Sequence, residues 1–208
     1  MSDFVYSHVP GDGVSGVTLV LLHGTGGDEK DLLPLGRMLL PGATLLSPRG
    51  KVLEGGMPRY FRRLRENVFD LLDLRFRTNE LADFLGQFEG PLVAVGYSNG
   101  ANIAASTMLL RPEIFAGAVL LRARVPIEPD RAPDLSGKSA LVSGGRRDTI
   151  ISPQGAVELA QVLRQYGADV TLNQENAGHE LTAGELEIAR AWVGEFAAGL
   201  RERSSVAS

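Results

Sequence analysis

The chain has 208 residues, a formal net charge of −4 and no cysteine. This length fits one domain, the charge offers no basic face for nucleic acid, and the absence of cysteine excludes disulfides, thiol nucleophiles and thiolate metal sites. No apolar stretch approaches membrane-spanning length, and residues 1–4 lack the order of a signal peptide, so we expect a cytoplasmic protein with neither membrane nor nucleic acid as a partner.

The first half of the chain alternates between apolar runs and helical periodicity. Residues 17–22 predict a strand buried on both faces, 28–40 a helix and 43–46 a second strand. Residues 54–75 are rich in glycine and then in charge, and they fit neither pattern well. Residues 76–88 predict a helix with its apolar residues on one side.

The second half continues the alternation. The predicted elements are a strand that ends at Tyr97, a helix to about Leu110, a strand over 117–121, a proline-containing loop over 124–136, a strand over 139–143, a helix over 153–166, a strand over 169–174 and a closing helix over 181–200. This order indicates an α/β fold with a mostly parallel sheet covered by helices on both faces. We expect a single domain over residues 1–203 and a C-terminal tail over 204–208.

Residues 96–100 read Gly-Tyr-Ser-Asn-Gly, directly after an apolar strand and before a helix-forming run. A Gly-x-Ser-x-Gly turn between strand and helix exposes the serine hydroxyl above the edge of the sheet. A side chain at either glycine would collide with the neighbouring strand or helix. The context predicts Ser98 as a nucleophile.

Two partners follow later strands, where ligand sites of parallel sheets lie. Asp148 follows the strand over 139–143, and His179 follows the strand over 169–174. A serine hydroxyl needs an imidazole to take its proton and a carboxylate to orient that imidazole. The order Ser98, Asp148, His179 is the order of the α/β-hydrolases, and Asp169, the rival acid, lies at the wrong end of its strand.

A second motif, His-Gly-Thr-Gly-Gly over residues 23–27, follows the first predicted strand. Such a loop lends one backbone N–H to an oxyanion hole, and the residue after the nucleophile lends the other. The expected donors are therefore Thr25 and Asn99. His23 is expected to brace the loop rather than to react.

The basic residues between Arg59 and Arg77 leave two interpretations open. They could form a solvated helix face, since acidic residues are interspersed among them. Alternatively, Arg59 or Arg62 lines the pocket and binds a substrate carboxylate. The apolar wall of that pocket would then consist of Tyr60, Phe61 and Met57. Arg122 and Arg124 are also expected near the site.

These motifs, together with Ser-Pro-Arg-Gly at 47–50, Phe-Arg-Arg at 61–63 and Gly-His at 178–179, resemble the phospholipase/carboxylesterase group of α/β-hydrolases, and within it the small bacterial carboxylesterases of the MhqD type. The resemblance spans nearly the whole chain. It implies an α/β-hydrolase fold without a large lid, a triad of Ser98, Asp148 and His179, oxyanion donors Thr25 and Asn99, no metal or cofactor, and often a homodimer.

The sequence thus predicts a serine carboxylesterase that acts on small carboxylic esters. Two alternatives stay open. The same fold could carry a lysophospholipase or acyl-thioesterase, with a groove for a long acyl chain. It could also carry a non-catalytic protein that binds a small ligand.

Overall fold

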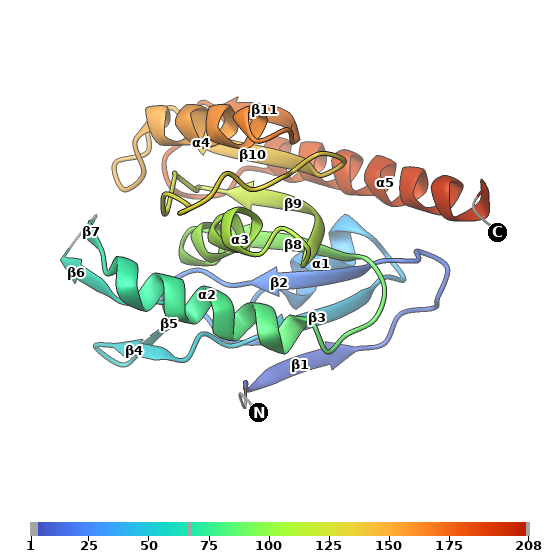
Figure 1. Cartoon of the computed structure of the whole chain (residues 1–208), viewed down its shortest axis with the longest axis horizontal. Coiled ribbons are helices and arrows are strands. Elements are labelled where there is room, and N and C mark those ends of the chain that lie inside the picture. Colours follow the sequence, from blue (N-terminus) through green and yellow to red (C-terminus); the bar gives the residue numbers. More distant parts are fainter. Residues whose placement is uncertain (1–3, 66–67, 207–208) are drawn as a thin grey trace.

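A seven-stranded sheet forms the centre of the computed structural model, which describes residues 4–65 and 68–206. In spatial order its strands are β1 (Tyr6–Val9), β3 (Thr44–Pro48), β2 (Thr18–Leu22), β8 (Leu92–Tyr97), β9 (Phe115–Leu121), β10 (Ser139–Gly145) and β11 (Asp169–Glu175). β1 runs antiparallel to β3, and the other neighbouring strands are parallel, as Figure 1 shows. The carboxyl ends of six strands therefore meet at one edge of the sheet.

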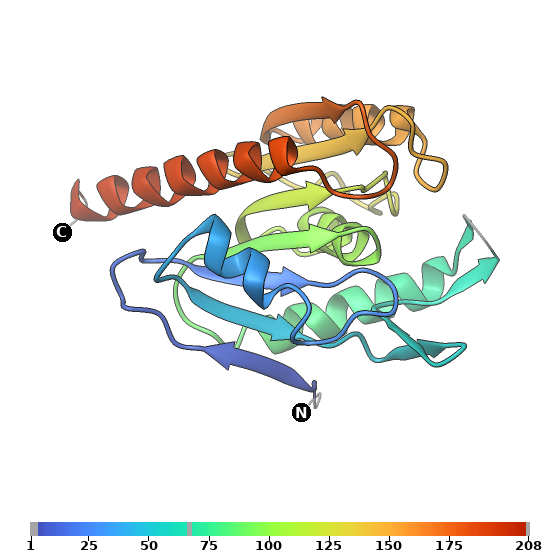
Figure 2. The same cartoon turned by 180° about the vertical axis from the view of Figure 1, so that it is seen from behind.

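Helices cover both faces of this sheet. On the face seen in Figure 1 lie α2 (Leu71–Leu85), α3 (Asn99–Leu110) and α4 (Pro153–Gln165), and on the face seen in Figure 2 lie α1 (Leu33–Leu39) and α5 (Ala183–Val206). None of the helices in the described residues combines the length and the apolar character that a bilayer crossing requires. The predicted mostly parallel α/β sheet with two helical layers is confirmed.

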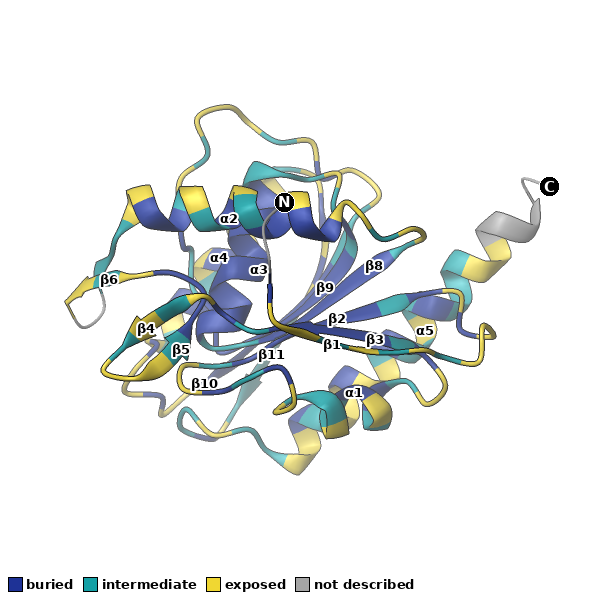
Figure 3. Cartoon of the chain, turned by 90° about the horizontal axis from the view of Figure 1, so that it is seen from below, coloured by how far each residue is buried: buried dark blue, intermediate teal, exposed yellow. Residues whose placement is uncertain are grey.

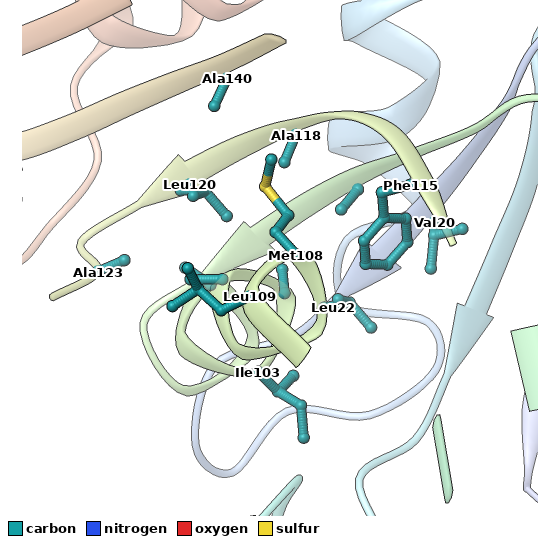
Figure 4. Close-up of a cluster of buried hydrophobic side chains, with 14 of the residues drawn as sticks. Val20, Leu22, Ile103, Met108, Leu109, Phe115, Ala118, Leu120, Ala123 and Ala140 are labelled. Carbon is teal, nitrogen blue, oxygen red and sulfur yellow. The ribbon is translucent and has the colours of Figure 1, made fainter. Parts of the chain in front are cut away.

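The core divides into two clusters because successive side chains of a strand point to opposite faces. On β2, Leu19 and Leu21 pack toward α1 and α5, whereas Val20 and Leu22 pack toward α3. Figure 4 shows part of the second cluster around α3, where Val20 and Leu22 of β2 and Phe115 of β9 lie beside the helix. Burial of each such large side chain stabilises the fold by about 1.5–3 kcal/mol.

The region that fitted no pattern forms two hairpins, which project from the sheet in Figure 1 and whose strands include exposed residues in Figure 3. Their strands are β4 (Val52–Glu54), β5 (Met57–Arg59), β6 (Arg63–Arg65) and β7 (Val68–Phe69). A solvated helix face is therefore wrong for Arg59, Arg63 and Arg65, which lie on strands. That interpretation is correct for Arg75 and Arg77, which lie on α2.

Several element limits differ from the predicted ones. The helix predicted over 28–40 begins only at Leu33, with a proline in its first turn, because the preceding residues form turns. α2 begins five residues before the predicted start, since Asp70 caps it by accepting the backbone N–H of Asp73 at 3.1 Å. β1 was not predicted. α5 continues to Val206 and thus includes the first residues of the expected tail, whereas residues 207–208 lie outside the described part.

His23 joins the end of β2 to the segment that follows β3. Its imidazole is fully buried, its Nε2 accepts the backbone N–H of Gly50 at 2.9 Å, and its Nδ1 lies 2.6 Å from the carbonyl oxygen of Gly24. Because an amide can only donate, Nε2 must be unprotonated and Nδ1 carries the proton. The ring is thus neutral, and it braces the loop of residues 23–27 as expected.

Burial lowers the pKa of His23 below its ordinary value. A histidine whose pKa is lower in the folded state takes up its proton preferentially in the unfolded state, so its stabilising contribution is complete above about pH 6.5 and is lost as the pH falls further. We expect the free energy of unfolding to decrease below this pH with a slope of at most about 1.4 kcal/mol per pH unit from this group. His23→Asn should remove that part of the slope in urea unfolding curves between pH 5 and 8.

His8→Asn is the matched control, because His8 is exposed on β1. This variant should keep the slope of the unaltered protein. An unchanged slope in His23→Asn would contradict the assignment.

Candidate active site

The turn between β8 and α3 holds Ser98 in strained backbone. Its φ is 52° and its ψ is −111°, a region that residues with a side chain rarely adopt. The surrounding structure maintains this conformation: the backbone N–H of Ser98 donates to the carbonyl oxygen of Leu121 at 2.8 Å, and the Asn102 amide donates to the carbonyl oxygen of Ser98 at 2.8 Å. The hydroxyl is thereby directed away from the sheet.

The two motif glycines allow this turn for steric reasons. A Cβ on Gly96 would lie 2.6 Å from the Cα of Ala101 in α3. A Cβ on Gly100 would overlap the backbone of Leu22 and His23 at the end of β2. The prediction that a side chain at either glycine would collide with the neighbouring strand or helix is confirmed.

Ser98, His179 and Asp148 are connected by hydrogen bonds, although they lie far apart in the sequence. Nε2 of His179 lies 2.9 Å from Oγ of Ser98, and Nδ1 of His179 lies 2.8 Å from Oδ2 of Asp148. An ionised carboxylate can only accept, so Nδ1 carries the proton and Nε2 is free to accept the serine proton. The imidazole remains partly open, with 19% of its side chain exposed.

Asp148 is held by the loop that follows β10. Its side chain is fully buried, and its Oδ1 accepts the backbone N–H groups of Ile150 and Ile151 at 2.8 and 2.9 Å. These bonds occupy one carboxylate oxygen and leave the other for His179. The rival acid, Asp169, begins β11 at the opposite edge of the sheet.

A small cavity of about 60 Å³ lies beside Ser98. Its described lining residues are Thr25, Arg59, Arg63, Phe69, Ser98, Asn99, Asn102, Ile150 and Ile151. Asn99 is fixed because its Oδ1 accepts the backbone N–H of Tyr60 at 2.8 Å, while its buried Nδ2 has no partner among the described residues. Thr25 and Asn99, the expected oxyanion donors, thus lie in the wall next to the serine.

The structure brings some of the expected pocket residues to this cavity and not others. Arg59 lines it, whereas the side chain of Arg62 is 61% exposed and pairs with Asp70 and Asp73. Tyr60 is buried beneath the site, where its hydroxyl donates to the carbonyl oxygen of Pro48 at 2.6 Å. The aromatic wall is Phe69, not Tyr60.

Arg124 lines a second cavity, of about 360 Å³, on the other side of Ile150. Its guanidinium lies 4.1 Å from the centre of the Phe69 ring, and burial lowers the pKa of this group. Arg124 thus lies near the site, as expected, because Ile150 lines both this cavity and the cavity beside Ser98.

Arg122 holds the loop that carries His179, a role that the sequence alone did not indicate. Its fully buried guanidinium donates to the carbonyl oxygens of Gly178 and Glu180, at 3.0 and 2.6 Å, and pairs with the buried carboxylate of Glu185 in α5. Its Nε also lies 3.9 Å from Oδ2 of Asp148. The only available signal was an arginine directly after a buried strand.

Tyr97, the residue before Ser98, reaches the same loop. Its hydroxyl donates to the carbonyl oxygen of His179 at 3.0 Å. Burial raises the pKa of Tyr97, so the hydroxyl remains a donor at neutral pH.

Comparison with known proteins agrees with this geometry. No protein-family model matches the chain. The chain is 46% identical over 195 residues to the hydrolase MhqD of Bacillus subtilis (strain 168), a match that covers 90% of this chain and 98% of MhqD.

Solved structures give the same result. The Bacillus cereus carboxylesterase shares 46% identity and a TM-score of 0.86, over 91% of this chain and 93% of its own. YahD, solved with malic acid, shares 29% identity and a TM-score of 0.85, over 93% and 100% of the two chains. Matches of this extent and identity show more than a common fold, and the chain belongs to the carboxylesterase-type α/β-hydrolases, in the group of hydrolases that includes MhqD.

Proposed function

We propose that this hydrolase is a serine carboxylesterase that cleaves small carboxylic esters through an acyl-enzyme. The observation that carries the proposal is the continuous hydrogen-bonded path from Ser98 Oγ through His179 to Asp148, at 2.9 and 2.8 Å. The first distance lies within the range in which an imidazole can take a hydroxyl proton. The second lies within the range in which a carboxylate can orient that imidazole.

In the proposed reaction, Ser98 Oγ attacks the ester carbonyl while His179 Nε2 takes its proton. The buried carboxylate of Asp148 stabilises the imidazolium that forms. His179 then gives the proton to the leaving alcohol, and water, activated by the same imidazole, releases the acid and restores Ser98. The backbone N–H groups of Thr25, in the loop after β2, and of Asn99 stabilise the oxyanion. Asn99 is the first residue of α3, and the first N–H groups of a helix have no partner within it.

The expectations about substrate class and about catalysis belong to this proposal. The small cavity beside Ser98 favours a small-molecule ester over a lysophospholipid or a long-chain acyl-thioester, because a long chain needs an extended apolar groove. The hydrogen-bonded path from Ser98 to Asp148 favours an enzyme over a non-catalytic binding protein. A cytoplasmic location and a homodimer remain expectations from the sequence and the resemblance.

Ser98→Ala removes the nucleophile and should lower kcat for 4-nitrophenyl butyrate by at least about 10³-fold, since loss of a triad serine leaves only binding and oxyanion stabilisation. A fluorophosphonate probe should label the unaltered protein and leave this variant unlabelled. Ser136→Ala, at an exposed loop serine, should retain both activity and labelling. Full turnover in Ser98→Ala would exclude the mechanism.

The acyl-chain preference can be measured with 4-nitrophenyl esters of increasing chain length. We expect kcat/KM to be highest for acyl groups of two to about four carbons, because the cavity beside Ser98 is small. A maximum at twelve or more carbons would favour the long-chain alternative.

Arg122 is proposed as a positioning residue for His179. Arg122→Met should lower stability by about 3–5 kcal/mol, because it leaves the Glu185 carboxylate buried and unpaired. It should also lower kcat with little change in KM, since the loop that carries the imidazole loses two hydrogen bonds.

The double variant Arg122→Met/Glu185→Gln separates these two effects. Removing the unpaired charge should recover much of the stability, measured by urea unfolding, while kcat stays low. Recovery of kcat together with stability would show that Arg122 acts through folding alone.

A further inference from the structure

The cavity beside Ser98 carries more positive than negative charge. Arg59 and Arg63 line it, and its described lining residues include no carboxylate. Glu54, on the neighbouring strand β4, serves both arginines: Oε1 lies 2.7 Å from Nε of Arg63, and Oε2 lies 3.3 Å from Nε of Arg59. One carboxylate thus faces two guanidinium groups, and these three side chains from the two hairpins together carry one net positive charge.

Arg59 is the more unusual of the two arginines. Its side chain is only 5% exposed, yet the one hydrogen bond that it makes to described residues runs from Nε to the carbonyl oxygen of Phe61, at 3.3 Å. Its two terminal nitrogens therefore have no acceptor among the described residues. Neither nitrogen is among the side-chain atoms that are cut off from solvent without a partner, so both donors are available to a group that enters the cavity.

The contacts with Glu54 and Phe61 hold Arg59 through Nε and the face of its guanidinium, and they leave the two terminal nitrogens unused. Because Arg59 is buried, water solvates its guanidinium poorly and the pKa of the group is lowered, although it stays protonated at neutral pH. An arginine presents two parallel N–H donors to a carboxylate, and this pairing is strongest where water is excluded. The unused donors of Arg59 match that geometry.

The cavity lies on the acyl side of the reacting ester. Thr25 and Asn99, whose backbone N–H groups would hold the carbonyl oxygen, both line it, whereas His179, which must protonate the leaving alcohol, is absent from its described lining. The carbonyl oxygen belongs to the acyl group. A group in this cavity is therefore part of the acid and not of the alcohol.

From these observations we infer that Arg59, supported by Arg63, forms a carboxylate subsite, and that the preferred substrates are half-esters of short dicarboxylic acids. This inference rests on the proposed esterase function and adds the substrate class. The bound carboxylate does not react: water cleaves the ester bond at the other end of the acyl group, which releases the alcohol, the dicarboxylate and a proton. The small volume of the cavity restricts the acyl group to a few carbons.

Two matched esters test the subsite. Monoethyl succinate carries a free carboxylate, and ethyl levulinate has the same chain with a neutral acetyl group in its place. Release of ethanol from each ester reports kcat/KM. We expect the unaltered protein to favour monoethyl succinate by at least tenfold, and this preference should decrease at high salt because screening weakens the attraction.

Arg59→Met keeps the length and apolar stem of the side chain and removes its charge. It should lower kcat/KM for monoethyl succinate at least tenfold more than kcat/KM for ethyl levulinate, mainly through KM. Arg59→Lys should recover part of the loss, since it restores the charge without the paired donors. Arg62→Met, at the exposed arginine outside the cavity, should leave both esters unaffected.

The possible failures are distinguishable. If Ser98-dependent hydrolysis is absent for both esters and for 4-nitrophenyl butyrate, the proposed function and the subsite are both overturned; if 4-nitrophenyl butyrate alone is cleaved, only the subsite is overturned. If Ser98-dependent hydrolysis occurs, but ethyl levulinate is preferred or Arg59→Met lowers both rates equally, only the subsite is overturned.

Discussion

The strained backbone of Ser98 is the constraint on which the rest of the site depends. A φ of 52° at a residue with a side chain costs free energy, and it persists because α3 starts in contact with the backbone of β2. The contact with β2 requires glycine at position 100, and a side chain at position 96 would collide with Ala101 in the first turn of α3. The same close approach brings the first turn of α3 beside the loop of Thr25, so one steric arrangement positions both the hydroxyl and the candidate oxyanion donors.

The loops around this turn are fixed by hydrogen bonds between buried side chains and the backbone. Asp148 accepts two amide N–H groups, His23 bridges two loops, and Arg122 binds two carbonyl oxygens of the loop that carries His179. Buried polar side chains of this kind stabilise one arrangement because any other would leave them unpaired. The parallel sheet brings the residues to one edge, and these contacts then set their distances.

The sequence was sufficient to predict the sheet and the grouping of Ser98, Asp148 and His179, because strand periodicity and motif order are local signals. It was insufficient where tertiary contacts decide. β1 is a short edge strand that depends on its pairing with β3, and the β4–β5 and β6–β7 hairpins have no clear periodicity. The different environments of Arg59 and Arg62, three residues apart, follow from the hairpin geometry, and the Arg122–Glu185 pair joins elements that are distant in sequence.

The loop after β10 holds Asp148, and its residue Ile150 lines both cavities. The bonds to Asp148 come from the backbone amides of Ile150 and Ile151, so they do not depend on which side chains these positions carry. Ile150 is itself 48% exposed. A substitution of Ile150 would therefore change the walls of both cavities and leave the two bonds that hold Asp148 intact.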